Sequence, residues 1–217
     1  MGLWIRPRNP QLFLPGADSK GMQVDPIAIG DRAPYFSLPG VTGRGFATLD
    51  QQQYSLADFD ADALVVVFTC NHCPTAIAYQ ERIKGIQAEY ADVDLVAINA
   101  NNAIEEHAGG NEYYPTDSIE HMNARAAEEE FNFPYLRDES QEVAKAYGAQ
   151  CTPHAFVFDQ NRSLVYQGAI DDDREGEDVS EQYVRDAIDA ILAGESYPID
   201  TISPMGCSTK WKGTLFG

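Results

Sequence analysis

The sequence predicts an α/β domain in which helices flank a central mixed β-sheet, and three observations support this. An apolar run rich in β-branched residues, Leu64 to Phe68, is typical of a buried strand, and an amphipathic helix follows from Thr75 to Tyr90. A second apolar run, Val93 to Asn99, completes a strand–helix–strand unit, which is expected to be parallel and right-handed. Phe156 to Tyr166 reads as a hairpin with a polar turn, ahead of a last helix over Glu181 to Ala193.

The remaining segments complete this domain in order. Residues 1–28 are expected to form an N-terminal arm, 29–195 the domain itself and 196–217 a C-terminal tail without regular periodicity. Early in the domain we expect a strand around Gly30 to Gly40 and a hairpin connection at Gly40 to Gly45. An irregular insertion over Asn101 to Pro115 is expected after the second core strand, and Ser118 then precedes a helix through about Glu130. An extended segment over Phe133 to Leu136 and a helix over Gln141 to Tyr147, ended by Gly148, are expected next.

Composition excludes several classes of protein. The net charge of −19 argues against nucleic acid as a partner and fits high solubility or a high-salt environment. Four cysteines in 217 residues do not make a disulfide scaffold. The N-terminal residues lack the continuous apolar run of a secretory signal, and polar residues interrupt the uncharged stretch from Ala63 to Gln80, so no membrane helix is expected. A cytoplasmic protein is the expectation.

The chemistry is concentrated in Cys70-Asn71-His72-Cys73-Pro74, between the first core strand and its helix. A thiol near a helix N-terminus meets unpaired backbone N–H groups and the positive end of the helix dipole, and both favour the thiolate. His72, when protonated, adds a cation beside Cys70, and Pro74 suits the first helical turn. The pattern predicts a redox-active dithiol, which needs no metal or cofactor.

With Thr152-Pro153 placed just before the late hairpin, this order of elements resembles the thioredoxin fold. The lead-in at Gly30 to Leu38 and the insertion after Asn99 are similar to those of the peroxiredoxin-like branch, the alkyl hydroperoxide reductase/thiol-specific antioxidant family. The resemblance covers about Ile29 to Ala193, most of the chain.

The resemblance implies a role for each matching residue. Cys70, the first and more exposed thiol, would attack substrate disulfides, and Cys73 would resolve the mixed disulfide. Pro153 would be a cis-proline lying against the dithiol. His72 stands where disulfide isomerases and oxidases also carry a histidine, which makes the disulfide a stronger oxidant. The expected substrate groove includes Thr69, Asn71 and Thr152.

The implied function is a thiol–disulfide oxidoreductase that acts on protein or small-molecule disulfides with a thioredoxin- or glutathione-type reductant. A thiol peroxidase acting on hydroperoxides is the alternative. Cys73-Pro74-Thr75 matches the peroxiredoxin motif, but Cys70 stands where that motif has a threonine. Pro153 stands where it has the arginine that helps to polarise the peroxide. Two of the three peroxide-handling residues are therefore missing.

A metal-binding protein is the rival class. Cys151-Thr152-Pro153-His154 is a C-x-x-H pattern, and together with Cys70 and Cys73 it would supply a Cys₃His set suited to Zn²⁺ or Cu(I). Cys151 is otherwise a candidate third redox thiol or a small buried hydrophobe, and the buried reading is favoured slightly.

Other reactive residues carry weaker signals. Cys207 is expected to be a plain thiol of the tail, with a fold back to the site as the alternative. His107 and His121 are expected to be solvated, as is the acidic loop over Asp171 to Asp178. A weaker hypothesis makes the chain a redox-regulated module whose acidic face selects a basic partner.

Overall fold

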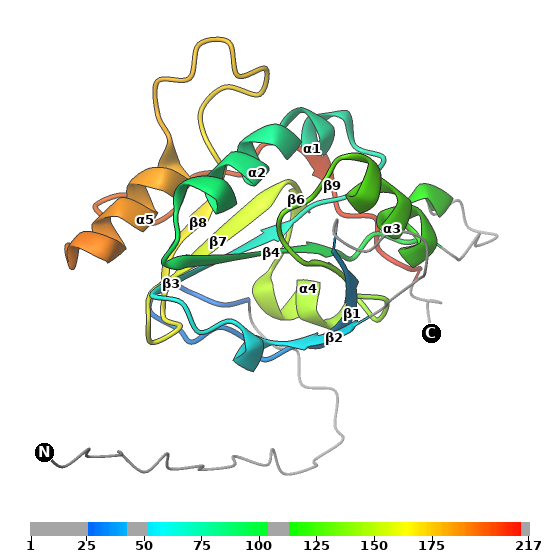
Figure 1. Cartoon of the computed structure of the whole chain (residues 1–217), viewed down its shortest axis with the longest axis horizontal. Coiled ribbons are helices and arrows are strands. Elements are labelled where there is room, and N and C mark those ends of the chain that lie inside the picture. The colour runs from blue at the N-terminus through cyan, green and yellow to red at the C-terminus, as the bar shows by residue number, and fades with distance from the viewer. Residues whose placement is uncertain (1–25, 43–51, 104–112, 214–217) are drawn as a thin grey trace, which may run out of the picture.

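The protein is built around one mixed β-sheet (Figure 1). The computed structural model describes residues 26–42, 52–103 and 113–213. In spatial order the seven strands of the sheet are β2 (Gln52–Ser55), β1 (Ser37–Val41), β5 (Tyr135–Arg137), β4 (Val93–Asn99), β3 (Ala63–Phe68), β7 (His154–Phe158) and β8 (Leu164–Gly168). A separate short ladder pairs β6 (Cys151–Thr152) with β9 (Cys207–Ser208).

Strand directions confirm the mixed sheet. β3 pairs in parallel with β4, and β4 pairs in parallel with β5, as the strand–helix–strand pattern predicts. β7 runs antiparallel to both β3 and β8, so the late hairpin is also confirmed. β1 and β2 pair as antiparallel strands, and β1 also runs antiparallel to β5.

The helices are α1 (Pro74–Ala78), α2 (Gln80–Glu89), α3 (Ile119–Glu128), α4 (Glu142–Tyr147) and α5 (Tyr183–Ala193), with 3₁₀ turns η1 (Leu56–Asp58) and η2 (Pro115–Asp117). The helix predicted over Thr75 to Tyr90 is thus two helices that meet at Tyr79. Gly148 ends α4 in the left-handed region at φ 72°, a conformation that glycine adopts without a Cβ penalty.

The alternation of side chains along β3 builds the two halves of the core. Val65 and Val67 belong to one buried cluster with residues of α2 and α5, whereas Leu64, Val66 and Phe68 belong to another with Tyr147 of α4. All six residues of β3 are buried. Figure 1 shows α1, α2 and α5 on one side of the sheet and α4 on the other. The strand that leads into the thiol motif is therefore fixed on both faces.

Some expectations fall outside the described residues, and one needs correction. The arm over residues 1–25, the connection over 43–51 and His107 lie outside the described residues. The acidic loop is exposed over Glu175 to Asp178, as expected, but Asp171 at its start is buried and paired with Arg82 of α2 at 2.7 Å. No helix among the described residues has the length and apolar character to cross a membrane.

Candidate functional site

The two cysteines of the motif lie between the end of β3 and the start of α1. Cys73 is the N-cap of α1, and Pro74 takes the first helical position, as the sequence predicts. Both thiols are reduced and buried, with 5% of Cys70 and none of Cys73 exposed. Cys70 is therefore the more exposed thiol, as expected, although by a small margin.

Thr152 and Pro153 lie against this dithiol. The Thr152–Pro153 peptide bond is cis, as the resemblance implied. The Sγ of Cys70 lies 3.0 Å from the hydroxyl oxygen of Thr152, and the Sγ of Cys73 lies 3.4 Å from the Thr152 carbonyl oxygen. One residue thus touches both sulfurs, which fixes the dithiol against the turn that precedes β7.

A buried carboxylate anchors the two residues between the cysteines. Asp117, at the end of η2, has no exposed surface. Its Oδ1 accepts hydrogen bonds from the backbone N–H of Asn71 at 2.7 Å and from Nδ2 of Asn99 at 3.1 Å. Its Oδ2 lies 2.5 Å from Nδ1 of His72, whose ring stacks on Tyr114 with 3.7 Å between centroids. Asp117 and Tyr114 therefore fix the position of the Asn71-His72 segment.

Sequence reasoning missed Asp117, Tyr114 and Asn99. Only Asn99 carries a usable signal, since it ends β4, and the carboxyl ends of parallel strands meet at the edge of the sheet where β3 delivers the thiols. Of the expected groove residues, Thr69 is buried, and its N–H donates to the Ile98 carbonyl at 2.9 Å. Thr69 therefore supports the site rather than lining an open groove.

The acidity of the two thiols differs from the expectation. Burial raises the pKa of Cys70 well above its usual range, and the Cys73 thiol and the Asp117 carboxylate add to this. The hydrogen bond from the Cys70 thiol, with smaller contributions from Cys207, lowers the pKa of Cys73 to about 4. Cys73 rather than Cys70 occupies the N-cap, so the pair holds its thiolate on the second cysteine.

Cys207 lies at the same site, and the expectation of a plain tail thiol was wrong. It packs against the cluster formed by Cys70, Cys73 and Ala76. β9 brings it there by pairing with β6, in a register that sets Cys207 opposite Thr152. Figure 1 shows β9 beside β6, close to the start of α1. Burial and the neighbouring Cys73 thiol raise the pKa of Cys207 to about 11.

The structure does not assemble the predicted Cys₃His metal site. Among the described residues, the set whose ligand atoms all lie within 4.8 Å of one another is Cys70, His72 and Asp117, without Cys151 or His154. The Cys151 thiol instead donates to the Pro153 carbonyl at 3.6 Å, and burial raises its pKa to about 11. His154 points into the core, where its ring lies 4.4 Å from that of Phe156 and burial lowers its pKa to about 4. Cys151 is a buried structural thiol, which is the interpretation that the sequence slightly favours.

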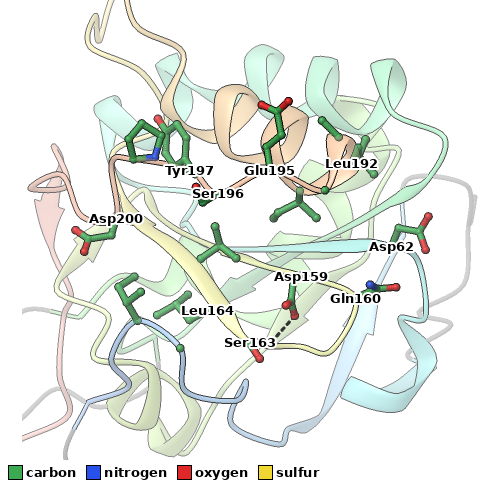
Figure 2. A pocket seen from close by; sticks show the side chains of 17 residues that line it. Asp62, Asp159, Gln160, Ser163, Leu164, Leu192, Glu195, Ser196, Tyr197 and Asp200 are labelled. Atoms are coloured by element: carbon green, nitrogen blue, oxygen red, sulfur yellow. Dashed lines mark hydrogen bonds between the residues drawn. The ribbon is translucent and has the colours of Figure 1, made fainter.

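A separate cavity of about 820 Å³ lies between the end of α5 and the turn after β7 (Figure 2). Its lining includes the carboxylates of Asp62, Asp159, Glu195 and Asp200, and no cysteine or histidine belongs to it. Its residues offer no thiol for disulfide exchange and no soft metal ligand, so the thiol cluster is the candidate active site.

Comparison with known proteins identifies the family. Residues 29–167 match the AhpC/TSA family. The chain belongs to this family. A hypothetical protein of Sinorhizobium meliloti 1021 is 36% identical, with a TM-score of 0.75 over 88% of this chain and 98% of that one. An uncharacterized conserved protein of Geobacillus kaustophilus is 38% identical, with a TM-score of 0.75 over 90% of this chain and 96% of that one.

More distant structures share the fold of this AhpC/TSA protein. A peroxidoxin of Mycobacterium tuberculosis is 18% identical, with a TM-score of 0.51 over 77% of this chain and 97% of that one. The search of curated proteins found no relative. Membership of the AhpC/TSA family supports an oxidoreductase that works through thiols, and the central sheet and flanking helices are those of the thioredoxin-like fold.

Proposed function

We propose that this protein is a thiol–disulfide oxidoreductase that cycles between a Cys70–Cys73 dithiol and the corresponding disulfide. The observation that carries the proposal is the shared position of the two sulfurs, which both contact Thr152 and belong to one buried cluster. Two thiols that contact the same residue in this way can close to the S–S distance of about 2.0 Å without a rearrangement of the fold.

In the reductive direction, Cys70 is the attacking thiol because Cys73 has no exposed surface. The Cys73 thiolate accepts the proton of Cys70, and the Cys70 sulfur attacks the substrate disulfide, releasing one substrate thiolate. Cys73 then passes this proton to the released substrate thiolate and attacks the Cys70 sulfur. The second substrate thiolate leaves, and the Cys70–Cys73 disulfide remains.

The neighbouring groups tune this cycle. The Thr152 hydroxyl lowers the pKa of Cys70, against the larger effect of burial, and so favours the attacking thiolate. Asp117 and Tyr114 fix the ring of His72, so the segment between the cysteines keeps one position during the reaction. The substrate disulfide takes two electrons from the dithiol, and a thiol reductant returns two electrons to the Cys70–Cys73 disulfide.

The decisive experiment equilibrates the whole protein with a series of glutathione redox buffers and traps the remaining thiols for mass analysis. Cys70 and Cys73 are expected to disappear together as a reversible pair, and Cys70→Ser is expected to abolish reduction of a test disulfide. Cys151→Ala is the matched control, because this buried thiol bonds to the Pro153 carbonyl and is expected to leave the pairing intact. Undiminished turnover by Cys70→Ser would refute the proposal.

Family membership also favours a thiol peroxidase as a second candidate. Consumption of hydrogen peroxide with thioredoxin as reductant, lost in Cys73→Ser, would support it. Oxidation of the protein by peroxide at the rate of free cysteine would exclude it. We favour disulfide exchange, because Cys70 and Pro153 replace the threonine and arginine of the peroxidatic motif.

A further inference from the structure

The segment after residue 200 is bound to the body of the protein along the edge of the thiol site. Beyond β9, the N–H of Thr209 donates to the Gln150 carbonyl at 3.0 Å, and the N–H of Lys210 donates to Oδ1 of Asn101 at 2.7 Å. Further on, the N–H of Lys212 donates to Oε1 of Gln141 at 2.7 Å. Before β9, the N–H of Ile202 donates to the Gln167 carbonyl at 3.1 Å, so bonds on both sides of the short strand hold it in a defined register.

A glycine allows the close approach of this segment to the cis-proline turn. A Cβ on Gly206 would lie 2.1 Å from the carbonyl oxygen of Thr152, a distance that no side chain tolerates. Gly206 therefore lets the next residue, Cys207, lie opposite Thr152. Thr152 is the residue that touches both Cys70 and Cys73, so the register brings a third sulfur to the dithiol.

Cys73 lies between two thiols. Cys70 belongs to the same buried cluster as Cys73, and Cys207 packs against that cluster, while both neighbouring thiols lower the pKa of Cys73. Two cations lie near Cys207, because Lys210 and Arg174 both lower its pKa, against the larger raising effect of burial. These cations favour a thiolate on Cys207 when the competing charge on Cys73 is removed, as it is once Cys73 forms a disulfide.

We propose that Cys207 is a third redox-active thiol, which exchanges with the Cys70–Cys73 disulfide to form a Cys73–Cys207 disulfide. The inference rests on the proposed function, since it starts from the oxidised dithiol. The Cys207 thiol loses its proton, and its sulfur attacks the sulfur of Cys73. The Cys70–Cys73 bond breaks, and Cys70 leaves as a thiolate that takes up the proton. No net oxidation occurs, so no further oxidant is needed.

The exchange changes which cysteine of the site carries the free thiol. Before it, the oxidised protein has no free thiol in the motif. After it, Cys70, the more exposed of the pair, is again a thiol while the protein remains at the same oxidation level. Because β9 occupies the backbone edge of β6, Cys207 reaches the dithiol as the cysteine of an extended substrate would.

The test maps disulfides in the full-length protein after partial oxidation with oxidised glutathione and alkylation of the remaining thiols. Wild-type protein is expected to yield a peptide pair linking Cys73 to Cys207 beside the Cys70–Cys73 product. Cys70→Ser is expected to lose the Cys73 and Cys207 thiols together, one for one. The double variant Cys70→Ser with Cys151→Ser is the control and is expected to form the Cys73–Cys207 disulfide. The double variant Cys70→Ser with Cys207→Ser is expected to form no disulfide at Cys73.

The outcomes separate this inference from the proposed function. If wild-type protein forms only Cys70–Cys73, and Cys207 stays alkylatable in Cys70→Ser, the third thiol is refuted while the dithiol cycle stands. A Cys73–Cys151 bond in Cys70→Ser would also refute it. If wild-type protein never forms Cys70–Cys73, the proposed function fails, and the exchange that starts from it fails too. The wild-type mapping does not depend on the folding of any variant.

Discussion

Nδ1 of His72 lies 2.5 Å from Oδ2 of Asp117, so a histidine between the two cysteines is paired with a carboxylate that has no contact with solvent. The carboxylate works against a thiolate on Cys70, because its charge raises the pKa of that thiol. The same carboxylate fixes the backbone of Asn71. Position and acidity of the first thiol are thus coupled through one side chain.

Asp117→Asn is expected to make Cys70 more acidic, because it removes the negative charge that raises its pKa. In a Cys73→Ser background, alkylation of Cys70 at neutral pH should be faster by about threefold or more. Alkylation rates followed by mass spectrometry measure this. Asp94→Asn is the control, since its carboxylate accepts from the Ala61 N–H and should leave the rate unchanged. Equal rates in both variants would contradict the assignment.

The low pKa of Cys73, about 4, predicts a thiolate in the reduced protein at neutral pH. Its ultraviolet absorbance should fade as the pH falls through that value and should be absent in Cys73→Ser. Since this pKa is depressed by folding, the charge stabilises the reduced fold fully above the ordinary thiol pKa, and the stabilisation is lost as the pH falls toward 4. Thiolate absorbance that develops only at alkaline pH would show that the pKa of Cys73 is not lowered.

Thr152→Val is expected to slow the attack of Cys70 on disulfides by about three- to tenfold, because it removes the hydroxyl 3.0 Å from Sγ that lowers the pKa of this thiol. The two side chains have nearly the same shape, so the fold should be retained. Thr209→Val, which loses a hydroxyl bonded to the Ala149 carbonyl, is the matched control. A pH profile of disulfide reduction should shift to higher pH in Thr152→Val alone.

Gly206→Ala is expected to push β9 away from β6, because the added Cβ would meet the Thr152 carbonyl. Alkylation of Cys207 should then be faster, and stability should fall by about 1–3 kcal/mol. Gly85→Ala is the control, since that helical glycine faces only the movable ends of Arg185 and Glu89. Its stability should rise slightly, with Cys207 as protected as before. Unchanged protection in Gly206→Ala would mean that the register is not set by this glycine.

Arg82→Ala is expected to destabilise the protein by about 3 kcal/mol, because it leaves the buried carboxylate of Asp171 without its cation. Arg82 also donates to the backbone carbonyls of Asp173 and Arg174, so the acidic loop should become susceptible to proteases. Urea unfolding measures the loss. Arg185→Ala breaks the exposed pair with Glu89 and should cost about 0.5 kcal/mol. Similar losses in the two variants would argue against the loop anchor.

The order of strands and helices could be predicted because apolar periodicity is local. The six buried residues of β3, the parallel step to β4 and the late hairpin all follow from short runs of sequence. The cis-proline beside the dithiol followed from the resemblance to the thioredoxin fold. The break at Tyr79 was missed, because the apolar spacing continues across it.

The surroundings of the thiols could not be predicted, because they depend on contacts between distant segments. Asp117 is one of many acidic residues, and only the folded chain shows it buried beneath His72. Cys207 lies in a segment without periodicity, and two short strands decide its place. The thiolate was expected on Cys70, but helix α1 begins at Pro74, which makes Cys73 its N-cap.

The pairing of β9 with β6 also affects how the protein matures. The segment over Gly206 to Lys212 leaves the ribosome after every other part of the site, so the nascent chain presents its two motif cysteines without their third neighbour. Until that segment docks, the edge of β6 stays open to any extended peptide. The thiol cluster is therefore completed only when this short stretch of chain docks.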